Sequence, residues 1–221
     1  MVTALLVGGG GGTWLLLGRA DAAGRATITR VGDACPLVPG ELLARVVPKP
    51  AAAVRAKSGS GDSAKTVCAW KAQTQPQVPD QKVRNLSVEI TVRQDDRATM
   101  GSAKEKTFYA GRRQRNERLL NTTSGSAVFG KVIAAEGVGD EAYTLYNKNE
   151  KGAFPRGGAF LMARFQNVDV LISLDGMDIP SESRTPTLDA RPLDEQTARR
   201  TVTDLGRRVV QGLAACGGRC R

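Results

Sequence analysis

Residues 158–174 read GAFLMARFQNVDVLISL, and this stretch decides the class of fold. The pair Gln166-Asn167 separates two apolar runs, which predicts a β-hairpin with arms at residues 158–165 and 168–174. The second arm alternates apolar and polar residues, so one of its faces should lie in the core. The first arm is apolar on both faces, which is typical of a central strand that is covered on both sides.

Two further patterns define what packs against this hairpin. Residues 86–92, LSVEITV, alternate cleanly and predict a strand whose core face carries Leu86, Val88, Ile90 and Val92. The C-terminal part predicts an amphipathic helix that begins after Asp194, a good N-cap. Its apolar stripe would be formed by Ala198, Val202, Leu205, Val209 and Leu213, with Arg199, Arg200, Arg207 and Arg208 in solvent. Together these elements predict an α+β fold in which an antiparallel β-sheet is covered by helices.

The remaining elements follow from shorter signals. Residues 39–47 predict a short helix that is stopped by Pro48, and a helix through residues 100–108 should be capped by Asp95 and Asp96. Residues 67–71 predict a short strand that places Trp70 in the core, after a flexible loop at 57–63. Gly137 and Gly139 indicate a tight bend before a strand that runs to about residue 146. Residues 175–178 are interpreted as a turn, because the run of oxygen ligands that a calcium loop needs is absent.

Four cysteines allow three pairings, and their positions favour Cys35 with Cys68 and Cys216 with Cys220. The first bond would close a long, loop-rich segment, and the two glycines between Cys216 and Cys220 permit the bend that a short bridge needs. Free buried thiols and a metal site are the alternatives. A metal site is the weaker of the two, since the chain has no histidine and only one close pair of cysteines. We expect no metal and no cofactor.

The N-terminal segment differs in composition from the rest of the chain. Residues 1–18, MVTALLVGGGGGTWLLLG, carry no charged side chain and predict either a cleaved signal peptide or a transmembrane anchor. Residues 19–32 would be a tether, and residues 33–221 a single extracytoplasmic domain. No cysteine follows the apolar run directly, which argues against a lipid anchor.

The net charge of +10 suits an acidic partner such as lipid headgroups, an anionic wall polymer or nucleic acid. The densest positive run lies at residues 112–118, RRQRNER. Arginine offers forked donors that match phosphate and carboxylate groups. The candidate ligand-binding residues are therefore Arg112, Arg113, Arg115 and Arg118. The alternative is that this run is simply a solvated surface.

The Cys-Pro-Leu start of a short helix, the later Cys-x-Trp strand, the Gly-x-Gly-Asp-x-Ala strand entry and the closing helix form a recognisable series. It resembles a family of actinobacterial envelope lipoproteins and secreted proteins of unknown function, over roughly residues 33–215. The resemblance implies a fold similar to PsbP, an antiparallel sheet covered by helices. It supplies no catalytic residues.

These observations favour a non-enzymatic envelope domain, tethered to the membrane by its N-terminal segment or secreted, that binds an envelope polymer or an envelope protein. An envelope hydrolase is the first alternative, but without histidine no His-based triad is possible, and Asp140 and Glu141 should point to opposite faces of a strand. The second alternative is a nucleic-acid-binding protein. It is disfavoured because the basic run lacks interleaved aromatic residues. No catalytic residue is predicted.

Overall fold

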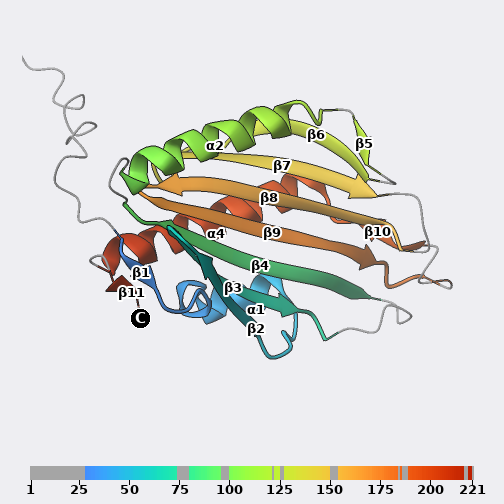
Figure 1. Ribbon diagram of the computed structural model, residues 1–221. Helices are drawn as coiled ribbons and strands as arrows, with labels where there is room; N and C mark the ends of the chain where they lie inside the picture. Colours follow the sequence, from blue (N-terminus) through green and yellow to red (C-terminus); the bar gives the residue numbers. More distant parts are fainter. Residues whose placement is uncertain are drawn as a thin grey trace, which may run out of the picture.

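A computed structural model describes residues 28–73, 80–95, 100–120, 122–124, 127–149, 154–183, 185, 189–216 and 219–220. The predicted N-terminal apolar segment (1–18) and residues 19–27 of the predicted tether lie outside these ranges. The described part is an α+β structure, as the sequence predicts: one large antiparallel sheet with helices on its two faces (Figure 1).

The sheet has the spatial order β2-β3-β4-β9-β8-β7-β6-β5, and every neighbouring pair is antiparallel. The bounds of its strands are β2 Val54–Ser60, β3 Ser63–Lys71, β4 Gln81–Arg93, β5 Thr123–Ser124, β6 Ala127–Ala134, β7 Glu141–Asn149, β8 Arg156–Phe165 and β9 Val168–Ile179. The short β10 (Arg191–Pro192) pairs with Met177 and Asp178 of β9. These residues follow Gly176, the last residue of β9 that pairs with β8. The predicted β8–β9 hairpin is confirmed, and it lies in the middle of the sheet.

Helices cover the two faces unequally. α4 (Glu195–Ala215) and the short α1 (Gly40–Val46) pack on one face, whereas α2 (Gly101–Glu117) crosses the other face, with contacts to β4, β9, β8 and β6 (Figure 1). The main core lies between the sheet and α4. The predicted stripe of α4 is confirmed, because Ala198, Val202, Leu205, Val209 and Leu213 are all buried there.

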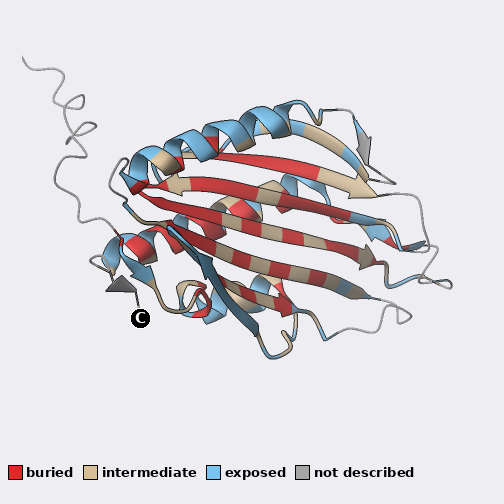
Figure 2. Ribbon diagram, viewed as in Figure 1, coloured by how far each residue is buried: buried red, intermediate tan, exposed pale blue. Residues whose placement is uncertain are grey.

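The predicted core faces of two strands are also confirmed. Buried and half-buried residues alternate along β4 and β9 (Figure 2). The buried side chains that face α4 are Leu86, Val88, Ile90 and Val92 of β4 and Val168, Val170, Ile172 and Leu174 of β9. The half-buried residues point to the α2 face, which is therefore open where α2 does not cover it.

A disulfide joins Cys35 to Cys68, as predicted, with a Cα–Cα distance of 5.2 Å. Cys35 lies in a 3-10 turn, η2 (Cys35–Leu37), that precedes α1, and Cys68 lies in β3, so the bond fixes the α1 segment to the sheet. Trp70 is buried in the same core, as predicted. Cys216 is also disulfide-bonded, but the side chain of Cys220 lies outside the described part, and their pairing stays a prediction.

Two shorter elements bring the ends of the domain together. β1 (Arg30–Val31) and β11 (Arg219–Cys220) form a parallel pair. Next to them, the buried Asn167 in the β8–β9 turn accepts a hydrogen bond from the Ile28 backbone N–H (3.2 Å) and donates one to the Ile28 carbonyl oxygen (2.8 Å). The chain thus enters the domain at the same end at which it leaves.

Two sequence predictions are wrong. The segment at 57–63 is not a flexible loop, because it forms the β2–β3 hairpin around Gly61, whose φ is +57°. Residues 175–178 are not a turn, since β9 continues to Ile179. Gly176 reflects a close approach of strands instead: a Cβ there would lie 2.1 Å from the Val83 carbonyl oxygen.

Helix and strand starts agree with the sequence in part. α2 begins at Gly101, whose N–H donates to the Asp95 carboxylate at 2.6 Å. Asp95 therefore caps the helix from six positions before its first residue, and not from the position next to it. Asp96 lies outside the described residues. The bend before β7 is confirmed, with φ values of +72° at Gly137 and +62° at Gly139.

The N-cap of α4 gives a first testable prediction. The Asp194 carboxylate accepts a hydrogen bond from the Thr197 N–H at 2.8 Å, as the sequence suggests. Asp194→Ala should lower the free energy of unfolding by about 1 kcal/mol, because it leaves a helix N–H without its partner. Urea denaturation measures this, and Asp194→Asn, which keeps an accepting oxygen, should cost less. An equal loss in both variants would show that the cap does not stabilise α4.

Candidate functional site

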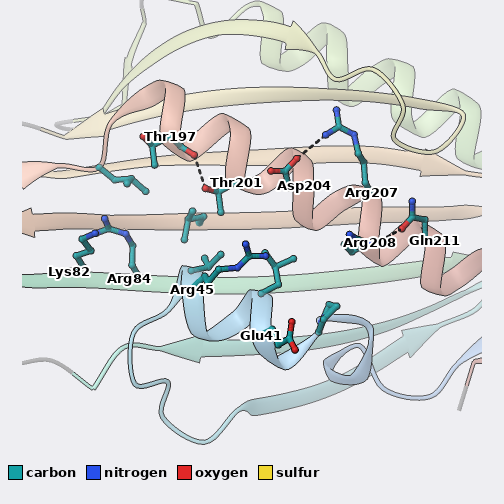
Figure 3. Close-up of a pocket in the computed structure, with 15 residues that line it drawn as sticks. Glu41, Arg45, Lys82, Arg84, Thr197, Thr201, Asp204, Arg207, Arg208 and Gln211 are labelled. Carbon is teal, nitrogen blue, oxygen red and sulfur yellow. Dashed lines mark hydrogen bonds and ion pairs between the residues drawn. The ribbon is translucent and has the colours of Figure 1, made fainter.

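A cleft of about 830 Å³ lies between α1 and α4, above β4 and β9 (Figure 3). Four other hollows are smaller, with volumes of about 350 to 470 Å³. Its lining comprises Pro39, Glu41, Leu42, Arg45 and Val46 from α1 and its start, Lys82 and Arg84 from β4, Leu174 from β9, Leu193, and Thr197, Thr201, Asp204, Arg207, Arg208 and Gln211 from α4.

One polar stripe of α4 forms a wall of the cleft. It consists of Thr197, Thr201, Asp204, Arg208 and Gln211. Their spacing of four, three, four and three residues places them on one side of the helix, beside the buried apolar stripe. The buried stripe therefore fixes the rotation of α4 and aims the polar stripe at α1 (Figure 3).

The opposite wall and the floor come from segments far apart in sequence. The turn after the Cys35–Cys68 bond sets the start of α1, whose Leu42 and Val46 pack against the core while Arg45 faces the cleft (Figure 3). The buried Leu174 and Leu193 make the floor apolar. The cleft thus combines an apolar floor with charged walls, which is typical of sites for small molecules.

Basic side chains outnumber acidic ones in the lining, and they differ in their partners. Arg84, with 8% of its side chain exposed, pairs with Asp178 and donates to the Met177 carbonyl oxygen at 2.7 Å. Arg207 pairs with Asp204 at 2.8 Å. Arg45, Lys82 and Arg208 form no ion pair with any described residue.

This arrangement can attract and orient an anion. Three cations from α1, β4 and α4 surround the opening without a carboxylate partner, while Thr197, Thr201 and Gln211 supply further hydrogen-bonding groups. Glu41 and Asp204 are the acidic side chains of the lining, and the latter is already held by Arg207. The sequence did not predict this cleft, but its prediction that Arg208 is exposed to solvent is confirmed.

The predicted arginine run divides over different sides of α2. The Arg112 guanidinium points to the sheet and pairs with Asp169 at 3.0 Å, and Arg113 pairs with Glu117 at 2.9 Å. Arg115 is exposed and lines a smaller hollow together with Arg112, whereas Arg118 is exposed beyond the helix end. The structure thus brings Arg112 and Arg115 together, but not all four.

Beneath α2 lies a buried network of charges. Glu105 is fully buried and accepts from Arg93 at 2.6 Å, next to the Arg112–Asp169 pair. Burial, with the nearby charge of Asp169, raises the pKa of Glu105 to about 7, and burial raises the pKa of Asp169 to about 6. Burial also raises the pKa of Tyr109, whose ring packs 5.5 Å from that of Tyr143. α2 is therefore held on the sheet by two ion pairs and by the packing of Tyr109.

Two predictions about charged side chains are wrong. Asp140 and Glu141 do converge, because Asp140 precedes the start of β7 and both carboxylates pair with Arg164, at 3.1 and 3.0 Å. This shared cation leaves neither carboxylate unpaired. Arg199 is not in solvent: only 11% of its side chain is exposed, and it donates to the Thr144 and Lys131 carbonyl oxygens.

One group of metal-ligating residues occurs among the described positions, formed by Asp33, Cys35 and Cys68. The two sulfur atoms are bonded to each other, so they cannot act as thiolate ligands. The pKa of Asp33 lies below its usual range, first because the Cys35 backbone N–H donates to its carboxylate. This group is accounted for by the disulfide and its local hydrogen bonds.

No protein-family model and no curated protein matches this chain. One solved structure with a similar fold is the extracellular domain of PknH from Mycobacterium tuberculosis, with a TM-score of 0.53 and 9% sequence identity. The match covers 87% of this chain and 98% of that domain. At this identity the likeness is one of fold. Among the described helices, none is both long and apolar enough to cross a lipid bilayer.

Proposed function

We propose that this chain is a non-enzymatic extracytoplasmic domain of an envelope protein, and that the α1–α4 cleft binds a small anionic ligand. The observation that carries the proposal is the set of three basic side chains, Arg45, Lys82 and Arg208, which line one cleft from three elements and have no ion-pair partner among the described residues.

The extracytoplasmic location is supported by three features. Disulfides persist in oxidising compartments, and the Cys35–Cys68 bond ties the wall of the cleft to the sheet. The apolar run at residues 1–18 suits export or anchoring to a membrane. The fold is similar to a domain described as extracellular.

The expected ligand carries a phosphate or carboxylate group on a small polar body. Arg45 and Arg208 can each donate two parallel hydrogen bonds to such a group, and Lys82 adds a compact charge. The Thr197 hydroxyl and the Gln211 amide can bond to hydroxyl groups of the same molecule. Inositol phosphate and glycerol phosphate are suitable probes, with inositol and glycerol as uncharged counterparts.

Isothermal titration calorimetry tests this proposal. Inositol phosphate or glycerol phosphate should bind, and the uncharged counterparts should bind much more weakly. Arg45→Ala and Arg208→Ala should each weaken binding about tenfold, since each removes a charged hydrogen-bond donor. Arg200→Ala is the matched control, because Arg200 is exposed on α4 and does not line the cleft.

The result has a clear alternative. Equal affinities for charged and uncharged probes, or equal losses in the Arg200→Ala and Arg208→Ala variants, would exclude the cleft as an anion site. Circular dichroism on each variant checks that the fold is retained, which is expected because the exchanged side chains are exposed.

A further inference from the structure

The sheet face that α2 leaves open carries side chains in aligned rows. α4 and α1 lie behind the sheet, and α2 crosses the front face with contacts to β4, β6, β8 and β9, so these strands are open in front only beyond α2 (Figure 1). Paired positions across β7, β8 and β9 form one row with Asn147, Gly158 and Asp175 and a second row with Leu145, Phe160 and Ser173. A polar row therefore lies directly beside a row with an aromatic ring.

Two adjoining hollows follow these rows. One, of about 350 Å³, lies beside α2 under Arg112 and Arg115, and the other, of about 400 Å³, lies over Gly158. They share Phe160 and Ser173 as lining residues, so they form one continuous surface, which we name the open-face trough. From Met162 to Gly158 the trough spans five residues of β8, or roughly 13 Å.

Gly158 keeps the second hollow free. A Cβ at this position would lie 2.8 Å from the Leu174 carbonyl oxygen and 2.9 Å from the Asp175 Cβ, so a larger residue does not fit. The gap leaves the side chains of Asn147 and Asp175 facing each other across an empty position in their row. The Asp175 carboxylate is held in place by Arg156 and Asn85, each at 3.0 Å.

The polar groups of the trough are available to a ligand. The side chains of Asn147, Ser173 and Arg115 make no hydrogen bond or ion pair with any described residue. The acidic Asp175 is paired with Arg156, and Arg112 with Asp169, which leaves Arg115 as an excess positive charge. The trough thus offers an apolar ring, groups that both donate and accept, and a cation.

We propose that the open-face trough binds a short acidic oligosaccharide. Sugar rings have apolar C–H faces that can lie on the half-buried Phe160 ring, and hydroxyl groups that donate and accept, as the Asn147 amide and the Ser173 hydroxyl require. A carboxylate or phosphate on the sugar would meet Arg115. An added peptide strand is disfavoured, because the trough lies over β8 in mid-sheet, where both neighbours already pair with the backbone.

The probe is trigalacturonic acid, and its methyl ester is a neutral counterpart with the same rings. Binding is measured by calorimetry on the full chain. Phe160→Ala and Arg115→Glu should each weaken binding of the acid about tenfold. The matched controls are Phe154→Ala, since Phe154 is 39% exposed but lies outside the trough, and Arg118→Glu, since Arg118 is exposed nearby and does not line it. Both controls should bind as the unaltered protein does.

Several outcomes would overturn the inference. They are no binding of trigalacturonic acid, equal binding of its methyl ester, equal losses with Arg115→Glu and Arg118→Glu, or equal binding of hexaglutamate, which carries charge without sugar rings. Arg115 is exposed, so its variant remains informative if Phe160→Ala does not fold. The Arg45→Ala and Arg208→Ala variants should leave trisaccharide binding intact, because the α1–α4 cleft lies on the opposite face of the sheet.

Discussion

Replacing Cys35 and Cys68 together by alanine should lower the free energy of unfolding by about 3 to 4 kcal/mol, the loop-entropy contribution of a bond that restrains the unfolded chain. The two residues are 33 apart in sequence, so the open chain gains much freedom when the bond is lost. Both are also buried in the main core beside Trp70, so hydration of the new side chains does not offset the loss of stability. Urea denaturation followed by tryptophan fluorescence measures the change.

The matched control is the other cysteine pair. Replacing Cys216 and Cys220 by alanine should cost only about 2 kcal/mol, because any bond between them closes a far shorter loop. Equal losses for the two pairs would contradict the loop-length argument. The Cys35–Cys68 variant should also bind inositol phosphate more weakly, because its bond fixes the segment that leads into α1, one wall of the cleft.

Local patterns predicted the elements whose burial is periodic. β4, the β8–β9 hairpin and α4 each have one face in the main core, and that burial leaves a period of two or 3.6 in the sequence. β2 was missed because all of its residues are exposed and backbone pairing with β3 holds it. β6 was missed because its register shifts between Phe129 and Val132, which breaks the alternation.

The candidate site could be predicted only in part. The arginine run was visible, but its division over the sides of α2 depends on the helical spacing of Glu105, Tyr109, Arg112 and Asn116, a polar stripe that faces the sheet. Hydrophobic patterns do not detect such a stripe. The α1–α4 cleft joins residues more than 100 positions apart, such as Arg45 and Arg208, and no local pattern relates them. Its signal was the second stripe of α4, which has a helical period but is polar.

The polar stripe of α2 that faces the sheet gives the second large prediction. Arg93→Met should destabilise the protein by about 3 to 5 kcal/mol at pH 8, because it leaves the fully buried Glu105 carboxylate without its cation. Methionine keeps part of the aliphatic length, so packing against Phe108, which lies 3.9 Å from the guanidinium, is partly retained. Arg113→Met is the control. It breaks the exposed pair with Glu117, which should cost less than 1 kcal/mol.

The effect of Arg93→Met should depend on pH in a defined direction. Burial and the charge of Asp169 raise the pKa of Glu105 from 4.5 to about 7, and burial raises that of Asp169 from 3.8 to about 6. Between the unfolded and the folded pKa of each group, the folded protein therefore binds more protons than the unfolded chain. The stability that the raised pKa values contribute at pH 4 is lost as the pH rises through 7. For Glu105 this loss is about 3 kcal/mol.

Arg93 and Arg112 oppose the rise in both pKa values, Lys65 opposes that of Asp169, and Glu89 adds to it. Removing Arg93 should raise the pKa of Glu105 further, so the variant should lose more stability at pH 8 than at pH 5. Glu105→Gln should reduce the pH dependence, and since the chain has no histidine, Asp169, with a pKa of about 6, should account for most of what remains in this window. A loss in Arg93→Met that is the same at pH 5 and pH 8 would mean that Glu105 does not titrate between these pH values, and that the helix is not held by a proton-sensitive pair.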